Sequence, residues 1–154
     1  MNYLLDTNVL VRLSNVLDPD FTTAVDAVAT LYQRQDTLFT VSQNITEFWA
    51  VATRPHSANG LSLSIPEAEQ QVQMYEINFP TLPDLQNVHH IWRNIARSLG
   101  IIGKQVHDAR LAAAAIAHGL DAILTFNVAH FTRFTGMFPN FQVIHPADVA
   151  SANP

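Results

Sequence analysis

Short apolar runs alternate with helix-forming segments along almost the whole chain, and this alternation limits the fold more than any other feature. Strand-like runs lie at residues 3–5, 38–41, 122–125 and 141–144, and at 78–82, where Pro80 interrupts the run. Helical spacing of apolar residues predicts helices at residues 8–14, 22–34, 42–54, 67–75, 85–99 and 105–118. This order predicts an α/β fold, a three-layer α/β/α sandwich around a mostly parallel sheet.

Capping and turn residues agree with these boundaries. Ser42 or Asn44 can cap the helix that ends before Pro55. Gly119 is the expected glycine after the helix at 105–118, and Asn59-Gly60 indicates a turn. Residues 126–134 are predicted to form a loop with room for a short helix.

Length and composition indicate one cytoplasmic domain. The 154 residues suit a single domain over residues 1–146, followed by a loose C-terminal tail over 147–154. No apolar run reaches the ~20 residues of a membrane span. The first apolar run ends at Asp6, which argues against a secretory signal. The absence of cysteine excludes disulfides, thiolate metal sites and cysteine nucleophiles, and it fits a reducing compartment.

The charge balance counts against a simple nucleic-acid binder. The formal net charge is −5, and the eight Lys and Arg residues are scattered. Proteins that bind nucleic acids usually present a basic face. A polyanionic partner would therefore have to be held by a local basic rim, by metal ions or by the groove of a dimer.

Three carboxylates stand where separate elements meet the expected ligand-binding edge of the sheet. Asp6 follows the first strand, Glu47 lies in the first turns after the second, and Asp108 lies early in the helix that follows Gly103. Asn127 follows the fourth strand. In parallel sheets, ligands bind outside the carboxyl ends of the strands. We therefore expect these four side chains to share one site.

Carboxylates gathered in this way need protonation or a cation. Two ionised acids about 4 Å apart repel by roughly 4 kcal/mol at an effective dielectric constant near 20. Carboxylate oxygens suit Mg²⁺ or Mn²⁺ better than zinc, and the adjacent His89-His90 pair lacks zinc-ligand spacing. A cluster of this kind supports metal-dependent hydrolysis of phosphodiesters.

Each acid also has an ordinary structural explanation. Asp6 can cap the helix that follows it. Asn44 and Glu47 have the spacing of a capping box. Asp108 can be an acid of the first helical turn that the helix dipole stabilises, or it can form an ion pair with Lys104, four residues earlier.

Four motifs together resemble those of a known family. They are Leu5-Asp6-Thr7-Asn8, Asn44-Ile45-Thr46-Glu47-Phe48-Trp49 with Thr53-Arg54-Pro55, Gly103-Lys104-Gln105-Val106-His107-Asp108-Ala109-Arg110-Leu111, and Leu124-Thr125-Phe126-Asn127 with Phe131. In this order and spacing the chain resembles PIN-domain ribonucleases, and among them the VapC-type toxins of prokaryotic toxin–antitoxin pairs. Each motif alone is common, so the resemblance depends on all four.

The resemblance implies a Mg²⁺-dependent endoribonuclease toxin, with Mn²⁺ as an alternative ion. Such an enzyme hydrolyses RNA with a metal-activated water and leaves a 5′-phosphate and a 3′-hydroxyl. The resemblance also implies a homodimer and a cognate antitoxin that blocks the acidic site. Asp6, Glu47 and Asp108 match the family's metal-binding positions. Asp6 and Asp108 are the expected direct ligands, and Glu47 binds the metal or orients the water.

The fourth position of the family's site departs from the usual pattern. Many relatives have an aspartate where this chain has Asn127 or His130. We expect Asn127 to complete the catalytic set by supporting the substrate or a water. A second metal would be held weakly, which favours one-metal catalysis or a second ion recruited with the substrate phosphate.

Further polar residues near these motifs are candidates for substrate binding, although each could equally be an ordinary surface or structural residue. They are Asn8, Arg12, Arg54, Lys104, Thr125 and His130.

Two other functions are compatible with the sequence. A catalytically weak or inactive PIN-fold module could bind only an antitoxin or RNA, because the fourth carboxylate is missing. A domain that accepts phosphate on Asp6 is less compatible, since that chemistry needs a lysine beyond a late strand and no lysine follows Lys104.

Overall fold

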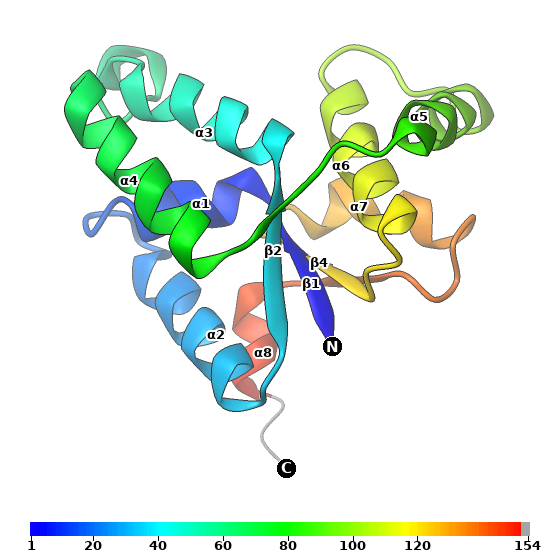
Figure 1. Ribbon diagram of the computed structural model, residues 1–154, viewed down its shortest axis with the longest axis horizontal. Helices are drawn as coiled ribbons and strands as arrows, with labels where there is room; N and C mark the ends of the chain where they lie inside the picture. The colour runs from blue at the N-terminus through cyan, green and yellow to red at the C-terminus, as the bar shows by residue number, and fades with distance from the viewer. Residues whose placement is uncertain (152–154) are drawn as a thin grey trace.

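The computed structural model describes residues 1–151 and contains a five-stranded parallel sheet between two layers of helices (Figure 1). The strands, in the spatial order β3-β2-β1-β4-β5, are β1 (Asn2–Leu5), β2 (Thr37–Val41), β3 (Thr81–Leu82), β4 (Ala122–Leu124) and β5 (Gln142–Ile144). All neighbouring strands run parallel, with Leu4 opposite Phe39 on one side and Ile123 on the other. The predicted α/β/α sandwich is confirmed.

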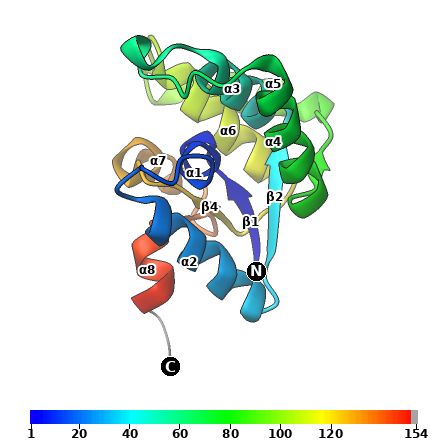
Figure 2. The ribbon, with the colours of Figure 1, turned by 90° about the vertical axis from the view of Figure 1, so that its left-hand side faces the viewer.

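Helices fill the connections between strands and form both outer layers (Figures 1 and 2). They are α1 (Thr7–Leu13), α2 (Phe21–Gln33), α3 (Ser42–Thr53), α4 (Ile65–Asn78), α5 (Gln86–Ser98), α6 (Gln105–Ala117), α7 (Val128–Thr135) and α8 (Pro146–Ser151), with a 3₁₀ turn at His56–Ala58. Within residues 1–151, none of the helices has the length and apolar character needed to cross a membrane.

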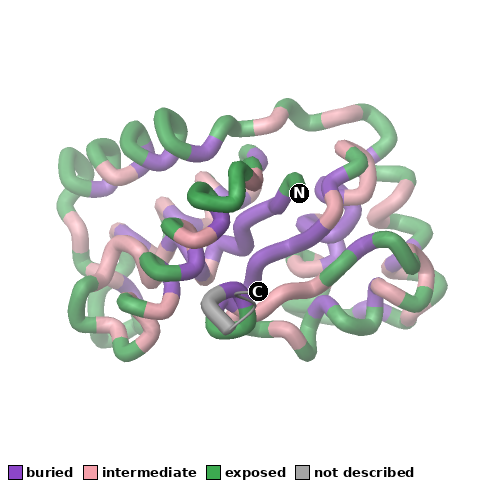
Figure 3. The backbone as a smooth tube through the Cα atoms, turned by 90° about the horizontal axis from the view of Figure 1, so that it is seen from below, coloured by how far each residue is buried: buried purple, intermediate pink, exposed green. Residues whose placement is uncertain are grey.

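Alternating side chains of the central strands divide the core into two parts. Tyr3 and Leu5 point into the layer made by α1, α2, α3, α4 and α8, whereas Leu4 and Ile123 point into the layer made by α5, α6 and α7. The central strands are therefore buried from both sides (Figure 3). The run Ala112–Ala115 is buried as well, so small side chains let α6 pack closely.

Three predicted segments differ from the structure. The strand at 78–82 shortens to Thr81–Leu82, because α4 continues to Asn78. At residues 126–134 the short helix that the prediction allowed is present as α7, and it covers most of the segment that was expected to be a loop. Most of the predicted loose tail at 147–154 belongs to α8, where Val149 is buried against the core and its carbonyl accepts a bond from Arg34 Nη2. Residues 152–154 lie outside the described part of the chain.

Asn44 joins the elements that carry the ligand-binding edge. Its side chain is fully buried, and its Oδ1 accepts a hydrogen bond from the backbone N–H of Val41 at 2.9 Å. Its Nδ2 donates to the carbonyl of Leu5 at 3.0 Å and to Thr7 Oγ1 at 3.3 Å. Asn44 therefore fixes the start of α3 against the end of β1.

We expect Asn44→Ala to lower the free energy of unfolding by about 2–4 kcal/mol, because it leaves buried backbone groups of Val41 and Leu5 without partners. Urea denaturation followed by circular dichroism measures this loss. Asn78→Ala is the control, since within residues 1–151 the exposed side chain of Asn78 bonds only to Met74 of its own helix. The carbonyl of Asn78, which accepts a bond from Tyr32, is kept in the variant, so stability should change by less than about 0.5 kcal/mol. Equal effects of the two variants would contradict the role of Asn44.

Candidate functional site

A cavity of about 480 Å³ lies where β1 ends, and it brings together residues that are distant in the sequence. Its lining consists of Asp6, Thr7, Asn8, Val11, Arg12, Glu47, Ala50, Val51, His107, Asp108 and Asn127. All four residues predicted to be catalytic are among them. They come from the end of β1, the second turn of α3, the first turn of α6 and the loop between β4 and α7.

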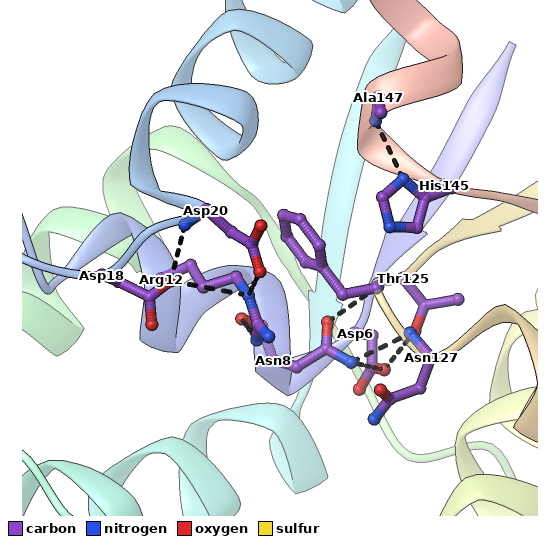
Figure 4. A network of polar contacts seen from close by, with 10 residues as sticks. Asp6, Asn8, Arg12, Asp18, Asp20, Thr125, Asn127, His145 and Ala147 are labelled. Atoms are coloured by element: carbon purple, nitrogen blue, oxygen red, sulfur yellow. Dashed lines mark hydrogen bonds and ion pairs between the residues drawn. The ribbon is translucent and has the colours of Figure 1, made fainter.

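Asp6 is the most buried acid of this cavity, with 6% of its surface exposed. Its Oδ2 accepts hydrogen bonds from Asn8 Nδ2 and from Thr125 Oγ1, both at 2.6 Å (Figure 4). Asp6 is the N-cap residue of α1, as the capping explanation expects, but its carboxylate forms no capping bond to that helix.

The electrostatic surroundings of Asp6 favour its neutral form. Burial raises its pKa from 3.8 to about 6, the negative charges of Asp108 and Glu47 add to this rise, and the hydrogen bond from Thr125 opposes it. Near neutral pH the ionised Asp6 is therefore held in an unfavourable place, and a cation beside it would relieve that cost.

Glu47 is held at both of its oxygens. Oε2 accepts a hydrogen bond from Thr7 Oγ1 at 2.8 Å, and Oε1 accepts one from Gln43 Nε2 at 2.8 Å. His107 Nδ1 lies 3.7 Å from Oε1. The capping-box explanation for Glu47 is wrong, because the residue that completes the box at the start of α3 is Asn44.

Gln43 links α3 to α6, and the sequence did not predict this role. Its Nε2 also donates to the carbonyl of His107 at 3.0 Å, and its Oε1 accepts a bond from Arg110 Nη1 at 3.0 Å. Gln43 stands four residues before Glu47, so the two side chains share one helical face. This spacing is the feature of the sequence that could have indicated their contact.

Asp108, in the first turn of α6, has a histidine partner. Its side chain is 26% exposed, and its Oδ2 lies 3.1 Å from His130 Nδ1. Burial raises the pKa of Asp108 and Glu47 adds to the rise, while His130 and His107 lower it. Within residues 1–151 Asp108 has no ion pair with Lys104, so that explanation is wrong.

Two residues that were predicted to contact the substrate, Asn8 and Thr125, form hydrogen bonds to Asp6 inside the site. Thr125 is fully buried and its hydroxyl donates a hydrogen bond to Asp6. It therefore has a structural role in place of the predicted contact with the substrate. Asn8 lines the cavity, but its Nδ2 also donates to Thr125 Oγ1 at 3.2 Å and its Oδ1 accepts from the N–H of Phe126 at 3.2 Å. Both residues orient Asp6.

The predicted cationic contacts are spread over different surroundings. Arg12 lines the cavity, but its Nε lies 3.1 Å from Asp20 Oδ2, and its guanidinium lies 4.2 Å from the ring centre of Phe126 (Figure 4). Arg54 and Lys104 are exposed and lie outside the cavity lining. His130 is outside the lining as well, and reaches the site through Asp108.

Hard divalent cations fit the donor set of this cavity chemically. Three carboxylates and the exposed amide of Asn127 supply oxygen ligands, which Mg²⁺ and Mn²⁺ prefer. Among residues 1–151, however, no three Asp, Glu or His side chains surround one point closely enough to hold an ion. Binding a cation would require these carboxylates to turn toward a common centre.

Solved structures of toxin–antitoxin proteins share this fold. The VapBC-1 structure from nontypeable Haemophilus influenzae matches with a TM-score of 0.69 and 18% identity, covering 95% of this chain and 98% of that one. VapBC2 from Rickettsia felis, bound to a promoter DNA fragment, matches with a TM-score of 0.65 and 20% identity over 94% and 98%. VapC20 from Mycobacterium tuberculosis, a toxin that cleaves the sarcin–ricin loop, matches at 0.64 and 14% over 85% and 94%.

A comparison of sequences supplies the family. No curated protein matches the chain. The family model of the PIN domain matches residues 3–136, which include all of β1 except Asn2, the whole cavity lining and α7. The chain therefore belongs to the PIN domain family.

Proposed function

We propose that this protein is a metal-dependent endoribonuclease toxin of the VapC type, with Mg²⁺ as its ion and Mn²⁺ as a substitute. The observation that carries the proposal is the buried carboxylate of Asp6, whose pKa is raised to about 6 in a cavity shared with Glu47 and Asp108. Perturbed acids of this kind occur preferentially at functional sites. Further support comes from the PIN domain match and from the fold of toxins such as VapC20.

In this proposal each residue of the cavity has a separate task. Asp6 and Asp108 would hold the cation, and a bound cation would supply charge neutralisation for the phosphate and would make a nearby water more acidic. Asn8 and Thr125 fix Asp6. Glu47, held by Thr7 and Gln43, offers a fixed carboxylate that orients the attacking water.

Asn127 is the proposed contact for the substrate. Its exposed side chain lines the cavity and has no hydrogen bond within the described part of the chain, while its backbone N–H donates to Thr125 Oγ1. A neutral amide adds no charge to the site. The proposal therefore involves one tightly held cation, and a second only together with the substrate phosphate.

An antitoxin partner and a homodimer complete the proposal. Two of the related structures are named VapBC, which supports an antitoxin as the partner of this chain. On this chain an apolar groove of about 340 Å³ lies between α2 and α4, where Val25, Tyr32 and Met74 are exposed. Such a groove suits an apolar segment of an antitoxin.

A second candidate function is a PIN module that binds RNA or antitoxin without cleaving RNA. The observation that favours it is the absence of a closed three-ligand site among residues 1–151. The metal and cleavage experiments below distinguish the two functions.

The pH dependence of stability tests the electrostatic cost of Asp6. With EDTA present, the folded state holds a proton on Asp6 up to about pH 6, whereas the unfolded state loses it near 3.8, so stability falls as pH rises through this range. Asp6→Asn removes this loss. We expect the variant to gain about 3 kcal/mol over wild type between pH 3 and pH 7, measured by urea denaturation.

Glu67→Gln is a control of opposite sign for that experiment. Hydrogen bonds from the side chain and backbone of Ser64 lower the pKa of Glu67, so its ionised form stabilises the fold above that pKa. This variant should be less stable than wild type at neutral pH, with a gap that narrows in acid. A gain for Asp6→Asn that does not change with pH would contradict the assignment to Asp6.

Metal binding is tested by thermal melting without substrate. In EDTA we expect Asp6→Asn and Asp108→Asn to melt above wild type, because each removes repulsion between acids. Millimolar MgCl₂ or MnCl₂ should then raise the melting temperature of wild type and leave both variants nearly unchanged. NaCl at the same ionic strength controls for screening. Equal shifts in all three proteins would exclude a cation held by these acids.

Cleavage is tested with a pool of labelled RNAs of varied sequence and structure. We expect wild type with Mg²⁺ or Mn²⁺ to give fragments with 5′-phosphate ends, and EDTA to stop the reaction. Asp6→Asn should lower the rate by at least about 100-fold, because it removes several kcal/mol of charge stabilisation. Asp26→Asn, an exposed acid on α2, is the control and should cleave normally. Metal binding without cleavage of any RNA would favour the non-catalytic module.

A further inference from the structure

The exposed face of α5 concentrates positive charge on an otherwise acidic chain. The helix contains Arg93, Arg97 and two histidines but no Asp or Glu, whereas the whole chain has a formal net charge of −5. His90, Arg93 and Arg97 are spaced by three and four residues, so they share one side of the helix. All three are exposed.

A shallow hollow lies along this side of α5. It has a volume of about 250 Å³ and is lined by His90, Arg93, Asn94 and Arg97. Every one of these side chains can donate a hydrogen bond, and none is aliphatic or acidic. A hollow with this lining fits an anion rather than an apolar ligand.

The two arginines of the hollow differ from other arginines of the protein. Arg12 is paired with Asp20 and Arg110 with Asp84. Arg93 and Arg97 have no ion pair or side-chain hydrogen bond anywhere in residues 1–151, and α5 contains no acid that could pair with them. Their guanidinium groups are therefore free to bind an external anion.

The position of α5 is tied to the catalytic side of the molecule. Trp92, the neighbour of Arg93, donates from Nε1 to the carbonyl of Val106 at 3.1 Å, two residues before Asp108. Buried side chains of α5 and α6 share one core cluster. In two perpendicular views α5 lies beside α6, at the opposite end of the molecule from α2 (Figures 1 and 2). An anion on α5 thus has a fixed place relative to the cavity.

We propose that the side of α5 formed by His90, Arg93, Asn94 and Arg97 binds the phosphate backbone of single-stranded RNA outside the cleavage cavity. This inference rests on the proposed function, because it takes RNA as the substrate. Arginine forks match phosphate oxygens in pairs. The Cα atoms of Arg93 and Arg97 are about 6 Å apart along the helix axis, so both guanidinium groups can reach one RNA strand. An acidic peptide is disfavoured because the hollow offers no apolar pocket for its side chains.

The experiment measures binding of a fluorescein-labelled, single-stranded RNA 20-mer of mixed sequence by anisotropy in EDTA. Cleavage does not take part, so a failed nuclease proposal leaves this test intact. We expect Arg93→Gln/Arg97→Gln to weaken binding about tenfold at 50 mM salt. The slope of log affinity against log salt should become smaller by about 1.4, which corresponds to two lost phosphate contacts on a single strand.

Matched controls separate a local contact from general charge. Arg97→Gln and Arg34→Gln each remove one positive charge, but Arg34 lies just after α2, at the far end of the molecule. Only Arg97→Gln should reduce the salt slope. Unchanged melting curves show that the variants fold. Wild-type affinity and slope in the double variant would overturn the proposal, as would a change in oligomeric state by light scattering without loss of RNA binding. Equal losses from Arg97→Gln and Arg34→Gln would overturn it as well.

Discussion

The rest of the site depends on the buried carboxylate of Asp6 and on the hydrogen bonds that hold it. It stands at the end of β1, where both layers of helices meet, and it accepts two short hydrogen bonds from Asn8 and Thr125. Those bonds hold the group in place, yet burial and two further acids raise its pKa to about 6. A fold designed only for stability would place an apolar residue here. The cost is consistent with a site that is completed by a cation.

The positions of the main acids could be anticipated because strand and helix patterns are local. The apolar run before Asp6 and the β-rich run at 38–41 identify two neighbouring parallel strands, and parallel strands direct their carboxyl ends to one edge. Asp6 follows β1 directly and Asn127 lies in the short loop after β4, so their meeting requires only the correct topology. To predict the positions of Glu47 and Asp108, one must also know that the helices that carry them, α3 and α6, begin at this edge of the sheet.

The hydrogen bonds between these elements could not be read from the sequence. Gln43 looks like an ordinary surface residue of a helix, and only the packing of α3 beside α6 lets it join Glu47 to the carbonyl of His107. The sequence predicts that Arg12 contacts the substrate, but it gives no sign that Asp20 lies beside this guanidinium in the fold. The same reason explains α8, because the short stretch after Pro146 folds only where Val149 can reach the core. Long-range partners decide each of these cases.

The distribution of charge gives an acidic protein a way to handle a polyanion. Acids line the cavity, where a cation can reverse their effect, and Arg12 and Arg110 are engaged by Asp20 and Asp84. The arginines of α5, which have no ion pair within residues 1–151, are left for contacts away from that cavity. In this view, the binding of RNA by α5 and the cleavage of RNA in the cavity are separate properties of the protein. The helix would hold the backbone through charge, whereas the cavity would act only after a cation is bound, so the two can be removed independently.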